Sequence, residues 1–202
     1  MSLAALEDDR GASPLSEAAR RYRIPISIAV SIVGLLVARP TEYSIMLGSG
    51  IAFMGLVYRA LAAGQIRKNE QLAVGGPYAL SRNPLYFGSF VIAIGFGIAC
   101  GSVVVLVIAV ALFLAMYASV IDREEAELRA LFGASFDQYA AAVPRILPRE
   151  FSLRRAFDGF SMSIYWKNRE YNALLGYCGA VGLLVLLMRL HGASSASDAI
   201  WL

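Results

Sequence analysis

Long apolar runs separated by short polar segments constrain this chain more than any other feature. The clearest runs are residues 43–63, 85–100, 102–121 and 171–190. Each approaches or reaches the roughly 20 residues that an α-helix needs to cross a bilayer. A shorter run, 24–38, is bracketed by Arg23 and Arg39, whose long side chains can reach the membrane surface and extend the usable length. We predict an all-α, polytopic membrane protein with about five transmembrane helices.

The composition supports a membrane protein and excludes several function classes. Charged residues make up 16% of the 202-residue chain, whereas soluble domains carry about a quarter. The formal charge of +3 is too small to indicate a nucleic-acid partner. Cys100 and Cys178 both fall in apolar runs, which argues against a disulfide or a zinc site. With His191 as the single histidine, no histidine-based metal site is expected.

The polar segments divide the chain. Residues 1–23 lack the apolar core and cleavage site of a signal peptide, so we expect them to remain, either as a partly helical surface arm or as a disordered tail. Residues 24–170 form the predicted membrane core, with polar segments at 64–84 and 122–150. Residues 171–202 add a last span and a tail.

The second polar segment predicts two short helices lying against the membrane face. Its leucine and phenylalanine residues follow a helical stripe, with Gly133 placed to end the first helix. Ser135 and Gln138 fit a capping box that would start the second helix.

Small residues predict close helix packing. They recur every fourth position at Ser44, Gly48 and Ala52, and again at Ala93, Gly97 and Gly101. Such repeats let membrane helices approach closely. Because Gly101 alone separates the third and fourth spans, residues 85–121 should form a tight antiparallel hairpin.

The basic residues predict the orientation. Of the 18 Lys and Arg residues, five spans leave Arg39 and Arg189 on one side of the membrane and the other sixteen on the opposite side. The positive-inside rule makes the richer side cytoplasmic. The N-terminus and both polar segments, 64–84 and 122–150, should therefore face the cytoplasm.

Two clusters of special residues flank the hairpin and should be neighbours in space, since its open ends meet. The first reads Gly76-Pro77-Tyr78, then Arg82-Asn83-Pro84-Leu85-Tyr86. The second reads Glu124-Glu125, then Phe132-Gly133, Tyr139, Val143-Pro144-Arg145 and Pro148. Asn83 as N-cap and Pro84 at the first helical position should start the third span.

This pair of clusters resembles the isoprenylcysteine carboxyl methyltransferase and phospholipid methyltransferase superfamily of integral membrane enzymes. The resemblance covers about residues 57–148, with both motifs in the expected order. Two positions depart from it. Asn83 stands where many members have His, and Phe136 stands where a Tyr is usual.

The resemblance implies methyl transfer from S-adenosylmethionine to a lipophilic acceptor that enters from the bilayer. It implies catalytic roles for Arg82, Glu125 and Arg145. The implied cofactor-binding residues are Gly76, Pro77, Tyr78, Arg82, Asn83, Pro84, Tyr86, Glu124, Glu125 and Tyr139. In this scheme Arg82 and the start of the third span hold the cofactor carboxylate. The glutamates accept from its hydroxyl or amino groups, and the tyrosines stack on adenine or face the sulfonium.

Other interpretations remain open on sequence grounds. Taken singly, the glutamates fit an ordinary charged helix start and the tyrosines an interfacial aromatic belt. The chain could instead be an NADPH-dependent membrane reductase related to sterol reductases, or a non-catalytic member of the fold. The sequence leaves open whether the acceptor is a prenylcysteine-like carboxylate or a phospholipid amine, and what the oligomeric state is.

Overall fold

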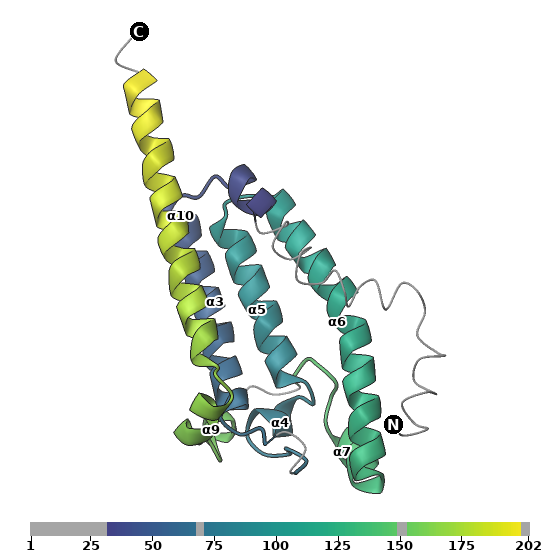
Figure 1. Cartoon of the computed structure of the whole chain (residues 1–202). Coiled ribbons are helices and arrows are strands. Elements are labelled where there is room, and N and C mark those ends of the chain that lie inside the picture. Colours follow the sequence, from purple (N-terminus) through teal and green to yellow (C-terminus); the bar gives the residue numbers. More distant parts are fainter. Residues whose placement is uncertain (1–31, 68–70, 149–152, 199–202) are drawn as a thin grey trace, which may run out of the picture.

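The computed structural model describes residues 32–67, 71–148 and 153–198, and all regular structure within these ranges is helical (Figure 1). Residues 32–37 are helical. The following helices are α3 (Glu42–Ala63), α4 (Pro77–Leu80), α5 (Pro84–Ala99), α6 (Val103–Phe132), α7 (Ala134–Ala142), α8 (Leu153–Phe157), α9 (Met162–Lys167) and α10 (Tyr171–Asp198). The predicted all-α class is confirmed.

Three of these helices are long and apolar enough to cross a membrane: α3, α6 and α10 as far as His191. The apolar α5 is shorter, at 16 residues, or about 24 Å of helix. These four occupy the places of four predicted spans. The predicted span 24–38 falls mostly outside the described residues, as does the arm 1–23. The chain is a polytopic membrane protein.

Helix α5 lies at the centre of the bundle, between α3 and α6, and α10 packs against α3 (Figure 1). Glycines make the α3–α5 contact close. A Cβ atom on Gly48 would lie 2.4 Å from the Gly95 carbonyl oxygen, and one on Gly55 would lie 2.6 Å from that of Gly88. The small residues therefore allow backbone-to-backbone packing, as the repeat predicted.

The hairpin between α5 and α6 is as tight as predicted. Gly101 has a φ of +65°, which glycine adopts readily, and a Cβ atom there would lie 2.3 Å from the Arg39 carbonyl oxygen. Ser102 then caps α6 by accepting a hydrogen bond from the Val105 amide. The turn thus brings the start of α6 back alongside α5.

One helix prediction is wrong. Helix α6 does not end near Ile121 but runs unbroken to Phe132, 30 residues in all, or about 45 Å. Its charged half contains good helix formers and no Gly or Pro, so nothing stops it before Gly133. The segment from 122 to 132 is therefore an extension of the span and not a separate short helix.

Gly133, with a φ of +52°, ends α6 as predicted and also precedes α7. The predicted capping box at Ser135 is absent, because α7 begins directly after Gly133 without a side-chain cap. Gly133 is therefore both the C-cap of α6 and the N-cap residue of α7.

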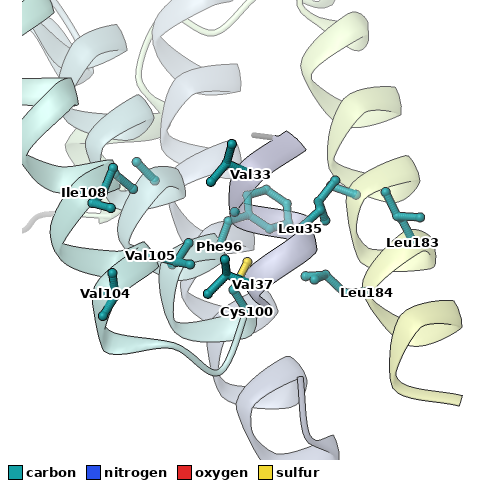
Figure 2. Close-up of a pocket in the computed structure, with 15 residues that line it drawn as sticks. Val33, Leu35, Val37, Phe96, Cys100, Val104, Val105, Ile108, Leu183 and Leu184 are labelled. Atoms are coloured by element: carbon teal, nitrogen blue, oxygen red, sulfur yellow. The ribbon is translucent and has the colours of Figure 1, made fainter. Parts of the chain in front are cut away.

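An apolar cavity of about 570 Å³ lies near the hairpin turn. Figure 2 shows Val33 and Val37 from the helical residues 32–37, Phe96 from α5, Val105 from α6 and Leu184 from α10 around it. It occupies the opposite end of the bundle from α4 and α7.

Candidate functional site

The two predicted clusters meet at the end of the bundle where α4 and α7 lie (Figure 1). Hydrogen bonds join residues 81–83 to residues 144–146. The Arg82 amide donates to the Pro144 carbonyl at 2.9 Å, the Ser81 hydroxyl to the Ile146 carbonyl at 2.7 Å and the Asn83 side-chain amide to the Arg145 carbonyl at 3.0 Å. The loop after α7 is thereby laid along the start of α5.

Ser81 is a residue of this junction that sequence reasoning missed. It is fully buried, and besides donating to Ile146 its hydroxyl accepts from the Asn83 amide at 3.2 Å. A single serine in a loop carries no chemical signal of its own. Its importance follows only from the partners that the fold supplies.

Glu125 is the centre of the charged cluster. Its Oε1 accepts from the Asn83 side-chain amide at 3.0 Å and lies 3.6 Å from Arg82 Nε. Its Oε2 lies 3.5 Å from Arg145 Nε. Both guanidinium Nε atoms are buried and have no hydrogen-bond partner. Two cationic groups from separate segments therefore converge on one carboxylate of α6.

Arg145 also binds a second carboxylate of α6, that of Asp122, one turn before Glu125. This hydrogen bond is the main cause that raises the pKa of Arg145 above its ordinary value. Asp122 was not predicted as a site residue. The unbroken helix α6 explains its place, since positions 122 and 125 share one face of it.

Glu124 faces a different partner. The Tyr86 hydroxyl donates to its Oε1 at 2.5 Å. From Tyr86 a series of half-buried aromatic rings runs along the α5–α6 contact: Tyr86 to Tyr117 with centroids 5.2 Å apart, Tyr117 to Phe113 at 4.3 Å and Phe113 to Phe90 at 5.3 Å. The two adjacent glutamates thus lie in different environments: Glu125 faces two arginines, and Glu124 faces the aromatic rings.

Comparison with known proteins follows the same residues. The phospholipid methyltransferase family model matches residues 43–135, which hold α3 to α6 and both glutamates. A protein-S-isoprenylcysteine O-methyltransferase of Schizosaccharomyces pombe is 31% identical over 100 residues, which is 50% of this chain and 42% of that protein. The chain belongs to the isoprenylcysteine carboxyl methyltransferase and phospholipid methyltransferase superfamily.

Two further relatives are named for metal resistance. The nickel-cobalt-cadmium resistance protein NccN of Alcaligenes xylosoxydans xylosoxydans is 34% identical over 152 residues, 68% of this chain and 70% of that protein. The cobalt-zinc-cadmium resistance protein CzcN of Cupriavidus metallidurans is 36% identical over 104 residues, 52% of this chain and 47% of that protein. No solved structure matches the chain at a significant level.

Asn83, the first departure from the superfamily pattern, corrects one prediction. It occupies the N-cap position of α5, and Pro84 is the first helical residue as expected, but the Asn83 side chain does not cap the helix. Its amide group instead donates to Glu125 and to the Arg145 carbonyl.

Phe136, the second departure, is fully buried in α7. Its ring lies 6.3 Å from that of Tyr139 and beneath the Arg129 guanidinium, 5.2 Å away. The Phe136 ring therefore packs α7 against the end of α6. A tyrosine at this position would place its hydroxyl in a packed interior.

Tyr78 and Tyr139 join the two clusters through the backbone. The Tyr139 hydroxyl donates to the Tyr78 carbonyl at 2.7 Å. The Tyr78 side chain is 6% exposed, and its hydroxyl has no hydrogen-bond partner. Burial raises the pKa of both tyrosines. Tyr78 is thus buried, whereas Tyr139 is half-buried.

Gly76 and Pro77 shape the approach to Tyr78. Gly76 has a φ of +53°, and a Cβ atom there would lie 1.9 Å from the side-chain nitrogen of Gln65. Pro77 starts the short helix α4. The path of the backbone thus requires glycine at position 76, and Pro77 starts the helix that carries Tyr78.

Proposed function

We propose that the protein transfers a methyl group from S-adenosylmethionine to a lipophilic acceptor at the junction of residues 81–83, 122–125 and 144–146. One observation carries the proposal. Arg82 and Arg145 converge on Glu125 from two separate segments, with their Nε atoms 3.6 Å and 3.5 Å from its carboxylate oxygens. A guanidinium carries five N–H donors, so those that do not face Glu125 can form charge-assisted hydrogen bonds with a bound carboxylate.

The donor set suits the cofactor. In this proposal Arg82, Arg145 and the first turn of α5 at Pro84 hold its carboxylate, with Asn83 fixing Glu125 beside them. Glu124 and Glu125 accept from its amino and hydroxyl groups, and Tyr86 lies beside the sulfonium. Gly76, Pro77, Tyr78 and Tyr139 form the enclosing wall. When bound, the cofactor supplies a methyl group already activated for displacement.

The protein's own contribution is alignment and exclusion of water. A carboxylate acceptor needs no general base, whereas an ammonium acceptor must first lose a proton. The single histidine, His191, lies in α10 and is absent from this junction. A prenylcysteine-like carboxylate is therefore the acceptor that needs least from these residues, and a phospholipid amine would depend on Glu124 or Glu125 as the base.

The aromatic series at the α5–α6 contact supports lateral entry of the acceptor. Tyr86, Phe90, Phe113 and Tyr117 are all half-buried, so each keeps part of its surface exposed. The series ends at Glu124 through the Tyr86 hydroxyl. We assign the aromatic side of the junction to the acceptor. The cofactor enters from the cytoplasmic side, which the positive-inside rule identifies.

Titration of purified protein with S-adenosylhomocysteine and with NADPH tests the cofactor. We expect S-adenosylhomocysteine to bind, and Arg82→Ala or Glu125→Ala to weaken binding by roughly tenfold or more, because each leaves a buried charge unpaired. Arg123→Ala is the matched control, since Arg123 pairs with Glu127 on the exposed side of the same helix. Stabilisation by NADPH alone would favour the reductase interpretation, and stabilisation by neither would favour a non-catalytic protein.

A labelled methyl donor with membrane lipid extract identifies the acceptor class. Label released as methanol by mild alkali marks a carboxyl methyl ester. Label that stays on the lipid marks an amine acceptor. No labelled product, from protein that binds S-adenosylhomocysteine, would contradict a lipophilic acceptor in that extract.

A further inference from the structure

A buried carboxylate outside the motifs lies at the turn between α9 and α10. Glu170 is 8% exposed, and among the charged residues that the structure describes it is the one classed as buried. Arg59 of α3 binds it through two parallel hydrogen bonds, Nε to Oε1 at 2.7 Å and Nη2 to Oε2 at 3.0 Å. This bidentate geometry is the strongest form of the pair. Neither Arg59 nor Glu170 was predicted as a site residue.

The backbone around Glu170 is held in an unusual conformation. The preceding residue, Arg169, has a φ of +53°, which non-glycine residues rarely adopt. Asn168 fixes this turn to the end of α3, where its side-chain amide donates to the Ala63 carbonyl at 2.7 Å and to the Ile66 carbonyl at 3.1 Å. Strained backbone persists where surrounding contacts determine it, and here it aims Glu170 at Arg59.

From Arg59 the hydrogen bonds continue into α5. Its Nη1 donates to the Ser89 hydroxyl at 2.5 Å, and that hydroxyl donates to the Leu85 carbonyl at 2.9 Å. Gly88 makes room for the arginine, since a Cβ atom there would lie 2.5 Å from Arg59 Cγ. Leu85 belongs to the first turn of α5. The chain of bonds therefore ends beside the residues that contact the two glutamates of α6.

The charges of this pair also reach α4. Burial is the main cause that raises the pKa of Tyr78, followed by Tyr139 and Glu124; Glu170 also raises it, and Arg59 lowers it. Tyr78 in turn accepts from Tyr139 through its carbonyl. The pair thus lies between the last span and both parts of the candidate site.

We propose that Glu170 is a positioning residue for the methyltransferase site. Through Arg59 and Ser89 it fixes the first turn of α5, and so keeps Asn83 in register with Glu125 and Tyr86 in register with Glu124. This gives a role to the C-terminal segment, which lies outside the residues 43–135 that the family model matches. The inference rests on the proposed function for its effect on catalysis, but its structural step is measurable without any cofactor.

Hydrogen exchange tests that step directly. In Glu170→Gln and in Ser89→Ala, the Phe87 amide, which donates to the Asn83 carbonyl at 3.0 Å and closes the first turn of α5, should exchange faster, by roughly tenfold, because the first variant weakens and the second breaks the same chain of bonds. Asp137→Asn is the matched control, as it breaks an exposed pair with Arg129 at the same 2.7 Å distance. Unchanged exchange in Ser89→Ala, which keeps the Arg59–Glu170 pair intact, would overturn the proposal even if Glu170→Gln failed to fold.

Cofactor affinity and kinetics test the functional step. Both variants should weaken S-adenosylhomocysteine binding and lower kcat/KM by roughly tenfold, since small misplacements are costly to aligned reactions. The double variant should be little worse than either single one, because both act through one chain. If both variants lose only thermal stability while affinity and kcat/KM stay at wild-type values, the pair is merely an anchor for α10. If the wild-type protein binds no S-adenosylhomocysteine, the proposed function fails. The exchange result still decides whether the bonds from Glu170 through Arg59 and Ser89 fix the first turn of α5.

Discussion

The Asn83 side chain donates to Glu125 at 3.0 Å across 42 positions of sequence, and this contact joins the start of α5 to the extension of α6. The same amide group also binds the carbonyl of Arg145. Asn83 therefore connects three segments that are separate in the chain. Many relatives place His here, a group that can also donate to a carboxylate but that titrates near neutral pH. Asn makes the connection without a protonation step.

Asn83→Asp should separate these segments. The new carboxylate would lie against Glu125 and could no longer donate to it, so both a buried hydrogen bond and charge balance are lost. We expect a loss of about 1–3 kcal/mol in the free energy of unfolding and much weaker S-adenosylhomocysteine binding. Thermal unfolding and calorimetry measure these effects. Asn172→Asp, at an exposed position of α10, is the control, and equal behaviour of the two variants would contradict the role of Asn83.

Local sequence patterns predicted the helices better than their ends. The apolar runs gave α3, α5, α6 and α10, and Gly133 gave the end of α6. The break predicted near Ile121 was wrong because polarity changes there while helix propensity does not. Polarity reports where the membrane ends, and a helix has no physical reason to end at that point.

The candidate site was predictable where residue types are distinctive and not where the partner is distant. Arg82, Asn83, Glu125 and Arg145 stand out by motif, and the fold brings them together. Ser81 and Glu170 do not stand out, because their roles depend on partners at Ile146 and Arg59. The side-chain direction of Asn83 was also unpredictable, since an N-cap bond and a bond to Glu125 compete for it. Such choices are made by tertiary contacts.

Gly95→Ala should disrupt the contact between α3 and α5. A Cβ atom at position 95 would lie 2.4 Å from the Ala52 amide nitrogen, which is backbone and cannot move aside alone. We expect a loss of about 1–3 kcal/mol, the usual cost of overpacking. Gly176→Ala in α10 is the matched control, because no atom lies within 4 Å of its Cβ position. Thermal unfolding in detergent should show a large fall for the first variant and none for the second.

Phe136→Tyr should destabilise the protein although it restores the residue usual in the superfamily. The ring is fully buried between Arg129 and Tyr139, so the added hydroxyl would be buried without a hydrogen-bond partner. We expect a cost of about 1–3 kcal/mol with unchanged affinity for S-adenosylhomocysteine. Phe136→Ala, at about 3–5 kcal/mol, gives the scale for losing the ring. Tighter cofactor binding by the Tyr variant would instead show that position 136 belongs to the cofactor site.

Alkaline pH should destabilise the protein through Tyr78 and Tyr139. Burial raises the pKa of both groups in the folded state, so their contribution is fully present below the unfolded value of about 10 and is lost as pH rises above it. Tyr139→Phe removes one of these groups. It should therefore lower stability by about 1 kcal/mol near pH 8, where the hydrogen bond to the Tyr78 carbonyl is lost, yet show a smaller loss than the wild-type protein between pH 10 and 11.5. Thermal unfolding across this range measures both slopes, and parallel curves for the two proteins would show that Tyr139 does not titrate with folding.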